Sequence, residues 1–474
     1  MDKFLFINGE WTGKGLERIE VFNPADGSVV GSVAAGGKEE TQEAISAASR
    51  AFSSWSRLSA YDRADYLMKL HDLMIEEKEE LAEIMTKEMG KPLKESLGEV
   101  VYAASFLKWF AEEGKRIYGR TIPSYAENKR MQVLKQPIGV VAAITPWNFP
   151  AAMITRKLGP ALAAGCTFIV KPPKETPLSA IKLVELSEKA GFPKGVINLI
   201  TGSSSVIGGE LMSSREVSKM TFTGSTEIGK KLIEQSAATV KNVSMELGGH
   251  APAIVLDDAD LKKAAAGVAA SKFRNAGQTC ICINRVYVHE KIYEEFIELL
   301  AAEVKKLKVG NGLEEGTDIG PIINKEGFDK IKQHVEDAVQ KGAVCVAGGN
   351  GTQQDGGCFF EPTVLKDVNH SMLIMNEETF GPVVPVQKIA SDEEGVRLAN
   401  DSLFGLAAYV YTESMSRGTR VVEGLQYGII GWNDGVPSAA QAPFGGMKES
   451  GIGREGGIEG LEAYLETKYV SIEL

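Results

Sequence analysis

The chain has 474 residues, of which 43% are hydrophobic and 24% charged. This is the balance of a globular protein, and the length predicts two or three domains. Its net charge of −11 argues against nucleic acid as a partner, because a phosphate backbone attracts basic proteins. No apolar run is long enough for a signal peptide or a membrane span, and the five cysteines do not match a secreted disulfide framework. We therefore expect a cytoplasmic protein without a membrane partner, although an organellar protein would have the same composition. We also expect no metal ion.

The first part of the chain is predicted to be helical, since residues 38–120 place Ala, Leu and Met at helical spacing with charges between them. From residue 137 onward, short β-branched runs bounded by Gly or Pro alternate with helical segments. The runs are PIGVVAAITP, CTFIVKP, GVINLITG and KMTFTG. Such alternation predicts a parallel sheet covered by helices on both faces. It starts again with APAIVL and RVYVHE, which predicts a second α/β domain beyond the Gly248–Gly249 pair.

Two segments have strand-like character but lie outside both α/β blocks. They are GRTIPSYAENKRMQVLKQ and the C-terminal EAYLETKYVSIEL. We interpret them as edge strands that pair with each other or with another subunit. The alternative is a surface hairpin and a packed C-terminal strand.

Cys280, in FRNAGQTCICIN, is the first candidate for chemistry. A free cysteine is usually a small buried hydrophobe, but this one follows a polar loop that contains Gly. Its thiolate would be a strong nucleophile if its pKa were lowered. The chain has five His and none close to Cys280 in sequence, so a protease-like Cys–His dyad has little support, although pairing in space stays open.

Three further features are weaker when each is taken alone. Glu246, 34 residues before Cys280 in SMELGGHAP, becomes a base near neutral pH if burial raises its pKa; otherwise it is a surface or capping residue. Asn148, in ITPWNFP, lies where ligand crevices open in parallel sheets and has an amide donor for an oxyanion; otherwise it caps a helix. Gly224 and Gly229, in FTGSTEIGKK, suit a phosphate at a helix start, without the full dinucleotide fingerprint.

Seven motifs stand together in a familiar order. They are PWNFP, KPPKETP, FTGSTEIG, MELGG, GQTC, EETFGPV and PFGGMKESGIGREGG. In their order and spacing the chain, from INGEW to LETKYVSI, resembles the aldehyde dehydrogenase superfamily, and within it the succinate-semialdehyde dehydrogenase branch. The resemblance implies an α/β fold with three parts and a homodimer or homotetramer. The parts are a Rossmann-type cofactor domain (1–114 and 138–248), an α/β catalytic domain (249–446) and a small β oligomerisation element (115–137 and 447–474).

The resemblance also implies roles for matching residues. Cys280 would be the nucleophile and Glu246 the general base, while Asn148 and the backbone N–H of Cys280 would form the oxyanion hole. Lys157 would tune the charge around cofactor and substrate. The residues implied to bind the cofactor are Thr145, Trp147, Lys171, Gly224, Ser225, Glu378 at the nicotinamide ribose and Phe380 beside the ring. The reaction would oxidise an aldehyde to an acid through a Cys thioester, with hydride transfer to NAD(P).

Lys174 bears on the choice of cofactor. Many NAD-preferring members have a Glu at this position, which binds the adenosine ribose hydroxyls. A lysine attracts a 2′-phosphate instead, and Lys171 adds a second charge. We therefore expect NADP to be accepted and preferred over NAD, unless Glu175 turns toward the ribose.

Arg156, Arg274 and Ser438 match the residues that hold the distal carboxylate in the succinate-semialdehyde branch. Arg274 lies six residues before Cys280, and Arg156 lies two helical turns after Asn148. The alternative for each arginine is a surface salt bridge. Two cations near one reacting centre suit a small anionic aldehyde. Succinate semialdehyde is the main expectation, with glutarate semialdehyde or a sulfonated aldehyde as alternatives. An acidic residue, Asp434, lies awkwardly close in sequence to this expected anion site.

Cys282 is either a packed side chain or a redox partner that forms a reversible disulfide with Cys280 under oxidation. Three other functions stay open. A coenzyme A-acylating enzyme would transfer the thioester, although Glu246 favours water as the acceptor. A non-enzymatic homologue would not need Cys280, Glu246 and Asn148, and a thiol hydrolase would not need a cofactor.

Overall fold

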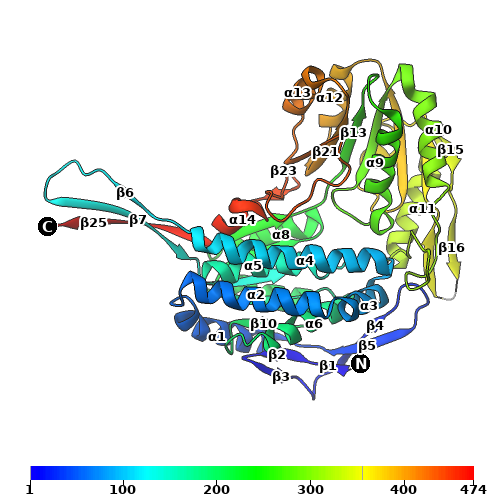
Figure 1. Cartoon of the computed structure of the whole chain (residues 1–474). Helices are drawn as coiled ribbons and strands as arrows, with labels where there is room; N and C mark the ends of the chain where they lie inside the picture. The colour runs from blue at the N-terminus through cyan, green and yellow to red at the C-terminus, as the bar shows by residue number, and fades with distance from the viewer. Residues whose placement is uncertain (1, 355) are drawn as a thin grey trace.

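The computed structural model describes residues 2–354 and 356–474. Two large sheets form its two α/β blocks (Figure 1). The first sheet has eight strands in the order β24-β12-β11-β8-β9-β10-β2-β3, and the second has seven in the order β15-β18-β19-β14-β13-β21-β22. The predicted α/β fold is thus confirmed.

Five central strands of the first sheet are parallel, as the alternating pattern predicted. They are β8 (Val140–Ile144), β9 (Thr167–Lys171), β10 (Ile197–Leu199), β11 (Val217–Thr223) and β12 (Asn242–Glu246). At the edges, β2 (Leu5–Ile7) and β24 (Gly451–Ile452) pair antiparallel to their neighbours. β3 (Glu10–Thr12) adds to β2, while β1 (Asp2–Lys3), β4 (Arg18–Phe22) and β5 (Val29–Ala34) form a separate small sheet.

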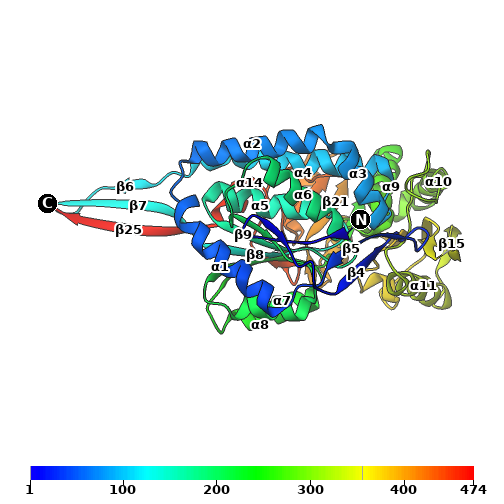
Figure 2. The ribbon, with the colours of Figure 1, turned by 90° about the horizontal axis from the view of Figure 1, so that it is seen from below.

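Helices cover both faces of this sheet, because its central strands are apolar on both sides (Figure 2). The predicted helical run gives α1 (Lys38–Trp55), α2 (Ala60–Glu76), α3 (Lys78–Met89) and α4 (Leu93–Glu113), followed by η1 (Gly114–Arg116). The crossover helices are α5 (Ala152–Ala164), α6 (Pro177–Lys189), α7 (Ser204–Ser213) and α8 (Thr226–Ser236). α4 packs on α5 and brings its side chains close to the end of β8.

The second sheet is built around a parallel β13–β14 pair, and its helices stand above α4 in Figure 1. Its strands are β13 (Ala251–Val255), β14 (Ile283–His289), β15 (Val344–Ala347), β18 (Thr363–Lys366), β19 (Val383–Ile389), β21 (Ala407–Tyr411) and β22 (Ile429–Trp432). Its helices are α9 (Leu261–Phe273), α10 (Tyr293–Val304), α11 (Lys325–Gln340), α12 (Asp392–Asn400) and α13 (Met415–Gly424), with short turns η2 (Arg274–Gly277), η3 (Glu290–Ile292) and η4 (Leu373–Met375). Two separate two-stranded sheets lie outside it: β16 (Gly351–Gln354) with β17 (Gly357–Phe360), and β20 (Phe404–Gly405) with β23 (Met447–Lys448).

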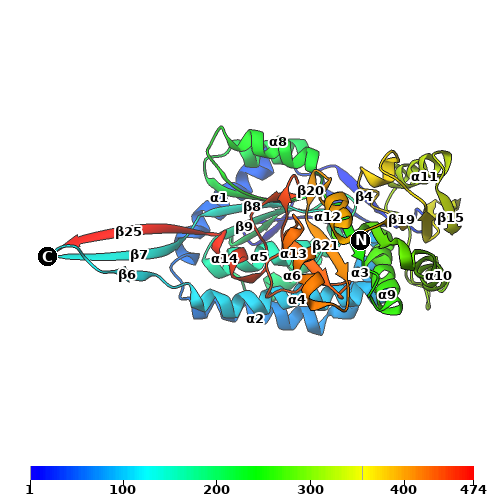
Figure 3. The ribbon, with the colours of Figure 1, turned by 90° about the horizontal axis from the view of Figure 1, so that it is seen from above.

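A three-stranded arm extends away from both blocks, with the C-terminus near its tip (Figure 3). It consists of β6 (Arg120–Ile122), β7 (Lys129–Pro137) and β25 (Leu465–Glu473), and β25 pairs antiparallel with β7 along its whole length. The prediction that these two segments pair with each other is therefore confirmed. None of the helices in the described ranges is long and apolar enough to cross a membrane.

The arm begins later than the oligomerisation element expected at 447–474. Residues 447–464 pack on the two blocks instead, since β24 pairs with β12 and α14 (Gly457–Glu462) contacts α5. Gly451 makes this possible, because a Cβ at its positive φ of 143° would lie 2.0 Å from the Met245 carbonyl. The C-terminal part of the arm is therefore β25 alone.

Candidate active site

Two cavities meet at Cys280, between the two α/β blocks. One, of about 310 Å³, is named the substrate-side cavity here and is lined by Glu95, Gly98, Glu99, Tyr102, Phe149, Met153, Arg156, Arg274, Thr279, Cys280, Ile281, Val436, Ser438 and Phe444. The other, of about 370 Å³, is named the cofactor-side cavity and lies against the ends of β8, β11 and β12. Only Cys280 and Met153 line both. A ligand in either cavity therefore lies against the same thiol.

The loop that carries Cys280 is held by close backbone contacts. Asn275, Ala276 and Gly277 adopt left-handed φ angles of 52°, 54° and 72° in succession. A Cβ on Gly277 would lie 2.1 Å from the Gly381 carbonyl, and one on Gly249 would lie 2.4 Å from the Cys280 carbonyl. These approaches require glycine and fix the loop between the two neighbouring segments.

The thiol of Cys280 is not activated by the protein alone. Burial, together with the carboxyl groups of Glu378 and Glu246, raises its pKa to about 12, against the opposing effect of Arg156. The thiol is therefore protonated at neutral pH. The lowered pKa that a thiolate nucleophile requires has to come from a proton acceptor or a charge that accompanies the reactants.

Glu246 ends β12 and is buried, which excludes the surface interpretation left open by the sequence. Neither of its carboxyl oxygens has a hydrogen-bond partner among the described residues. Burial and the nearby Glu455 raise its pKa well above the usual value for a carboxyl. A carboxyl in this state can take up a proton at neutral pH, which is what a general base requires.

Asn148 lies in the loop that follows β8 and lines the cofactor-side cavity. Its Nδ2 donates to the Gln278 carbonyl at 3.1 Å, which ties it to the loop of Cys280. Its own carbonyl accepts from Lys91 Nζ at 2.7 Å and from Asn275 Nδ2 at 3.0 Å. Lys91 in turn pairs with Glu99 at 2.5 Å, with both side chains buried. The capping interpretation of Asn148 does not apply, because Glu99 accepts the first N–H groups of α5.

Lys157 is buried behind the cavities and does not line either of them. Its Nζ donates to Thr223 Oγ1 and to Glu455 Oε1, each at 2.5 Å. It therefore affects the site through Glu455, whose charge acts on Glu246. Glu455 belongs to the REGG motif, but its role as the common partner of α5 cations was missed from the sequence.

The three residues predicted to bind a substrate anion all line the substrate-side cavity. Arg156 is 1% exposed; its Nε is 2.7 Å from Glu455 Oε2, and its Nη2 has no partner in the described part of the chain. Arg274 Nε likewise lacks a partner there. Ser438 Oγ is 2.5 Å from the hydroxyl of Tyr102. Asp434, the awkward acid, is exposed and caps the N–H of Val436 outside the cavity.

Of the predicted cofactor residues, five line the cofactor-side cavity: Trp147, Gly224, Ser225, Glu378 and Phe380. Trp147 and Phe380 meet edge to face with ring centres 5.6 Å apart. Glu378 accepts the N–H of Gly249 at 3.2 Å, and burial raises its pKa to about 7. α11 holds this segment, since Lys330 Nζ donates to the Glu378 carbonyl at 2.6 Å and His334 lies 3.1 Å from Thr379 Oγ1.

The other three predicted cofactor residues lie outside that lining. Thr145 has a buried hydroxyl with no partner among residues 2–354 and 356–474. Lys171 Nζ donates to Ser204 Oγ at 2.6 Å at the start of α7, and burial lowers its pKa to about 8. Lys174 is 76% exposed at its side chain and lies 3.8 Å from Glu175. These donors extend the polar surface from the cavity toward α7, and together they fit an anionic dinucleotide.

Cys282 is buried and has contacts of its own. Its Sγ donates to the Gly277 carbonyl at 3.4 Å and lies 3.7 Å from Lys272 Nζ. Both it and Cys280 are free thiols. The redox hypothesis stays a prediction: dithiothreitol would restore activity after peroxide treatment, and Cys282→Ala would lose that recovery.

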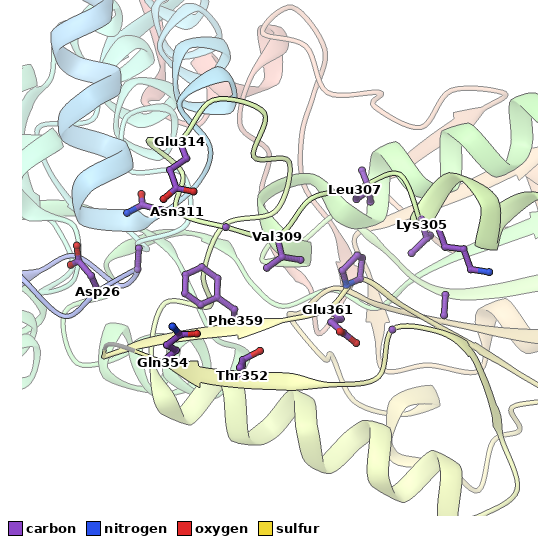
Figure 4. A pocket seen from close by; sticks show the side chains of 16 residues that line it. Asp26, Lys305, Leu307, Val309, Asn311, Glu314, Thr352, Gln354, Phe359 and Glu361 are labelled. Atoms are coloured by element: carbon purple, nitrogen blue, oxygen red, sulfur yellow. The ribbon is translucent and has the colours of Figure 1, made fainter.

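A further cavity, of about 700 Å³, lies between the turn at Asp26 and the β16–β17 hairpin (Figure 4). Asn311 and Glu314 lie on one side of it, with Thr352 and Gln354 of the hairpin on the other. It shares no lining residue with the two cavities at Cys280.

Comparison with known proteins agrees with this geometry. The model of the aldehyde dehydrogenase family, whose members use NAD(P), matches residues 11–470. Glutarate-semialdehyde dehydrogenase of Pseudomonas putida is 54% identical (99% of this chain and 97% of the relative), as is NADP-dependent succinate-semialdehyde dehydrogenase of Escherichia coli, with the same coverage. A 3-sulfolactaldehyde dehydrogenase of Pseudomonas putida is 51% identical over 98% of this chain and 96% of its own. The crystal structure of an NADP-dependent enzyme of Escherichia coli superposes with a TM-score of 0.98 at 53% identity, over 100% and 98% of the two chains. The chain therefore belongs to the aldehyde dehydrogenase family.

Proposed function

We propose that this aldehyde dehydrogenase oxidises a small aldehyde that carries an anion at its far end, with succinate semialdehyde as the main candidate. One observation carries the proposal: Arg156 and Arg274 line the same small cavity as Cys280, and each has a guanidinium nitrogen without a partner in the described chain. A buried guanidinium with a free N–H favours an anion that accepts it.

The names of the relatives support an anionic substrate and leave its identity open. The three relatives are named for glutarate semialdehyde, succinate semialdehyde and 3-sulfolactaldehyde, and each of these aldehydes carries a carboxylate or a sulfonate. A guanidinium binds either anion, so glutarate semialdehyde and a sulfonated aldehyde are the alternatives.

The residues around Cys280 suit a two-step reaction. Cys280 releases its thiol proton to solvent as its sulfur adds to the aldehyde carbon. The oxyanion is received by the Cys280 backbone N–H and the Asn148 amide, each worth about 3–4 kcal/mol in such sites. A bound nicotinamide would supply the hydride acceptor that conversion of the Cys280 adduct to a thioester requires. Glu246 then takes a proton from the water that hydrolyses the thioester, and Asn148 again holds the developing charge.

NADP is the proposed preferred cofactor, with NAD as the second choice. The support is a pair of cations beyond the cofactor-side cavity, Lys171 paired with Ser204 and the exposed Lys174. At neutral pH most Lys171 is protonated, because its lowered pKa is still about 8. A 2′-phosphate would find two positive charges and the start of α7 in this region.

The arm is the proposed contact between subunits of a homodimer or homotetramer. Its strand β25 has no second neighbour in the described chain, and Tyr469 and Ile472 on it are exposed. An unpaired strand edge with apolar side chains is suited to pairing with another copy. The sheets further support a division at residues 247–250 into a cofactor domain and a catalytic domain.

A panel of aldehydes tests the proposal. Succinate semialdehyde, glutarate semialdehyde, a sulfonated aldehyde and uncharged butanal and pentanal are compared by NAD(P)H absorbance, with each cofactor and with or without coenzyme A. We expect kcat/KM to be about 100-fold higher or more for the anionic aldehydes, as for other buried charge pairs, with no gain from coenzyme A. Equal values for charged and uncharged aldehydes would overturn the proposed substrate class.

A further inference from the structure

Another cavity adjoins the substrate-side cavity on its outer side. It measures about 340 Å³, opens at the surface beside α9 and is named the outer cavity here. Eight of its ten lining residues do not line the substrate-side cavity: Ala266, Ala269, Ala270, Phe273, Glu303, Leu307, Asp318 and Ile319. The other two, Glu95 and Arg274, also line the substrate-side cavity. These two side chains therefore form the wall between the cavities.

The wall is fixed by its contacts. Glu95 lies on α4, one helical turn before Glu99 and two before Tyr102, which line the same side of the substrate-side cavity. Its Oε2 accepts the N–H of Asn275 at 2.8 Å, on the loop that carries Cys280. The guanidinium of Arg274 lies 5.3 Å from the ring centre of Phe149. Glu95 is thus anchored to a strained backbone segment that has little freedom to move.

Among the residues that the structure describes, the outer cavity is lined by no cationic residue other than Arg274 that could bind an anion. Apart from Arg274, its charged residues are the acids Glu95, Glu303 and Asp318, and the rest of its lining is apolar. An anion that passed Arg274 would leave both arginines and face three carboxylates. An anion-bearing aldehyde therefore has to end at Arg274, while its other end reaches Cys280.

We propose that Glu95 sets the length limit of the substrate, by closing the substrate-side cavity directly beyond Arg274. This inference rests on the proposed function, because it assumes an aldehyde with an anion at its far end. A small residue at position 95 would join the two cavities. A longer chain could then place its middle methylene groups in the outer cavity, against the alanines of α9, while its carboxylate stays at the guanidinium of Arg274.

The test uses ω-oxo acids of four to eight carbons with the full-length enzyme, its cofactor and three variants. Glu95→Ala removes the wall, Glu95→Gln keeps its volume, and Lys94→Ala is the matched control on an exposed neighbour that lines neither cavity. We expect Glu95→Ala to raise kcat/KM for the eight-carbon acid relative to the four-carbon acid by about 10-fold or more, the range in which pockets discriminate by size. Glu95→Gln and Lys94→Ala should keep the wild-type profile. A shift as large in Glu95→Gln as in Glu95→Ala would overturn the steric wall.

Two further measurements separate the outcomes. Butanal oxidation checks that the loop of Cys280 survives the loss of the Glu95 hydrogen bond. Ala270→Phe fills part of the outer cavity, so it should cancel the gain of Glu95→Ala. If Glu95→Ala does not fold, Glu95→Ser takes its place. If wild-type enzyme does not prefer anionic aldehydes, the proposed function fails. If that preference holds but the length profile is the same without Glu95, this inference alone is overturned.

Discussion

The two cavities that share Cys280 are built from different parts of the fold. The cofactor-side cavity is lined largely by connecting segments at the ends of strands, where close backbone contacts such as that of Gly277 with Gly381 set the shape. The substrate-side cavity takes six of its fourteen lining residues from α4 and α5, among them Glu95 and Arg156. The first type of site changes little when one side chain is replaced. The second changes its ligand with each replacement, so substrate choice can vary while the reaction is kept.

The largest loss of activity should follow replacement of Cys280, the reactive side chain that lines both cavities. Cys280→Ala is expected to lower kcat/KM by about 10⁴-fold or more, as for other nucleophiles, because the covalent route is removed. NADP binding should persist, because backbone contacts determine the shape of the cofactor-side cavity. It can be measured by quenching of the fluorescence of Trp147 and its neighbours. Substantial residual oxidation would contradict the assignment of Cys280.

Glu246→Gln should stop the second step while leaving the first. We expect steady-state turnover to fall by about 10²–10⁴-fold, the usual contribution of a general base. A rapid-mixing experiment should still show a burst of NAD(P)H that matches the amount of enzyme. In wild-type enzyme the hydrolysis rate should rise with pH as Glu246 loses its proton, because burial raises its pKa, and the Gln variant should lack that rise. A pH profile identical in both enzymes would show that another group is the base.

Arg274→Ala tests whether a single side chain of the substrate-side cavity selects anionic aldehydes. The KM for succinate semialdehyde should rise by about 30-fold or more, while that for butanal changes little, because only the anion loses a charged partner. Arg120→Ala, on the arm, is the control. Arg156→Ala would in addition leave Glu455 with one fewer cation in a buried site, so it would change more than the anion contact. An equal rise for both aldehydes would show that Arg274 acts through folding.

Lys174→Ala should have the smallest effect, because its side chain is 76% exposed and solvent weakens its charge. The ratio of kcat/KM for NADP to that for NAD should fall about threefold at low salt, and less at high salt. Lys189→Ala, an exposed lysine on α6, should leave the ratio unchanged. A strong preference for NAD in the wild-type enzyme would contradict the proposed role of both lysines.

The sequence predicted the parallel strands, the helical run and the pairing of the arm segments, because each depends on a local pattern. It also placed Arg156, Arg274 and Ser438 in one site through the family resemblance. It did not reveal Lys91, Glu95, Glu99 or Glu455. A charged residue has the same local sequence pattern whether it faces water or a distant partner; Lys91, for example, contacts Asn148, which is 57 residues away. The arm of the structure is shorter than the oligomerisation element expected from the sequence for a similar reason, since β24 joins a sheet whose other strands lie some 200 residues earlier.

The raised pKa of Cys280, about 12, has a consequence for the enzyme between turnovers. A thiolate reacts with peroxides and electrophilic metabolites far faster than a thiol does. An enzyme that handles reactive aldehydes would be exposed to such damage if its nucleophile were permanently ionised. Burial beside Glu246 and Glu378 keeps the sulfur in the less reactive thiol form at rest, so that it becomes fully reactive only when the reactants are bound.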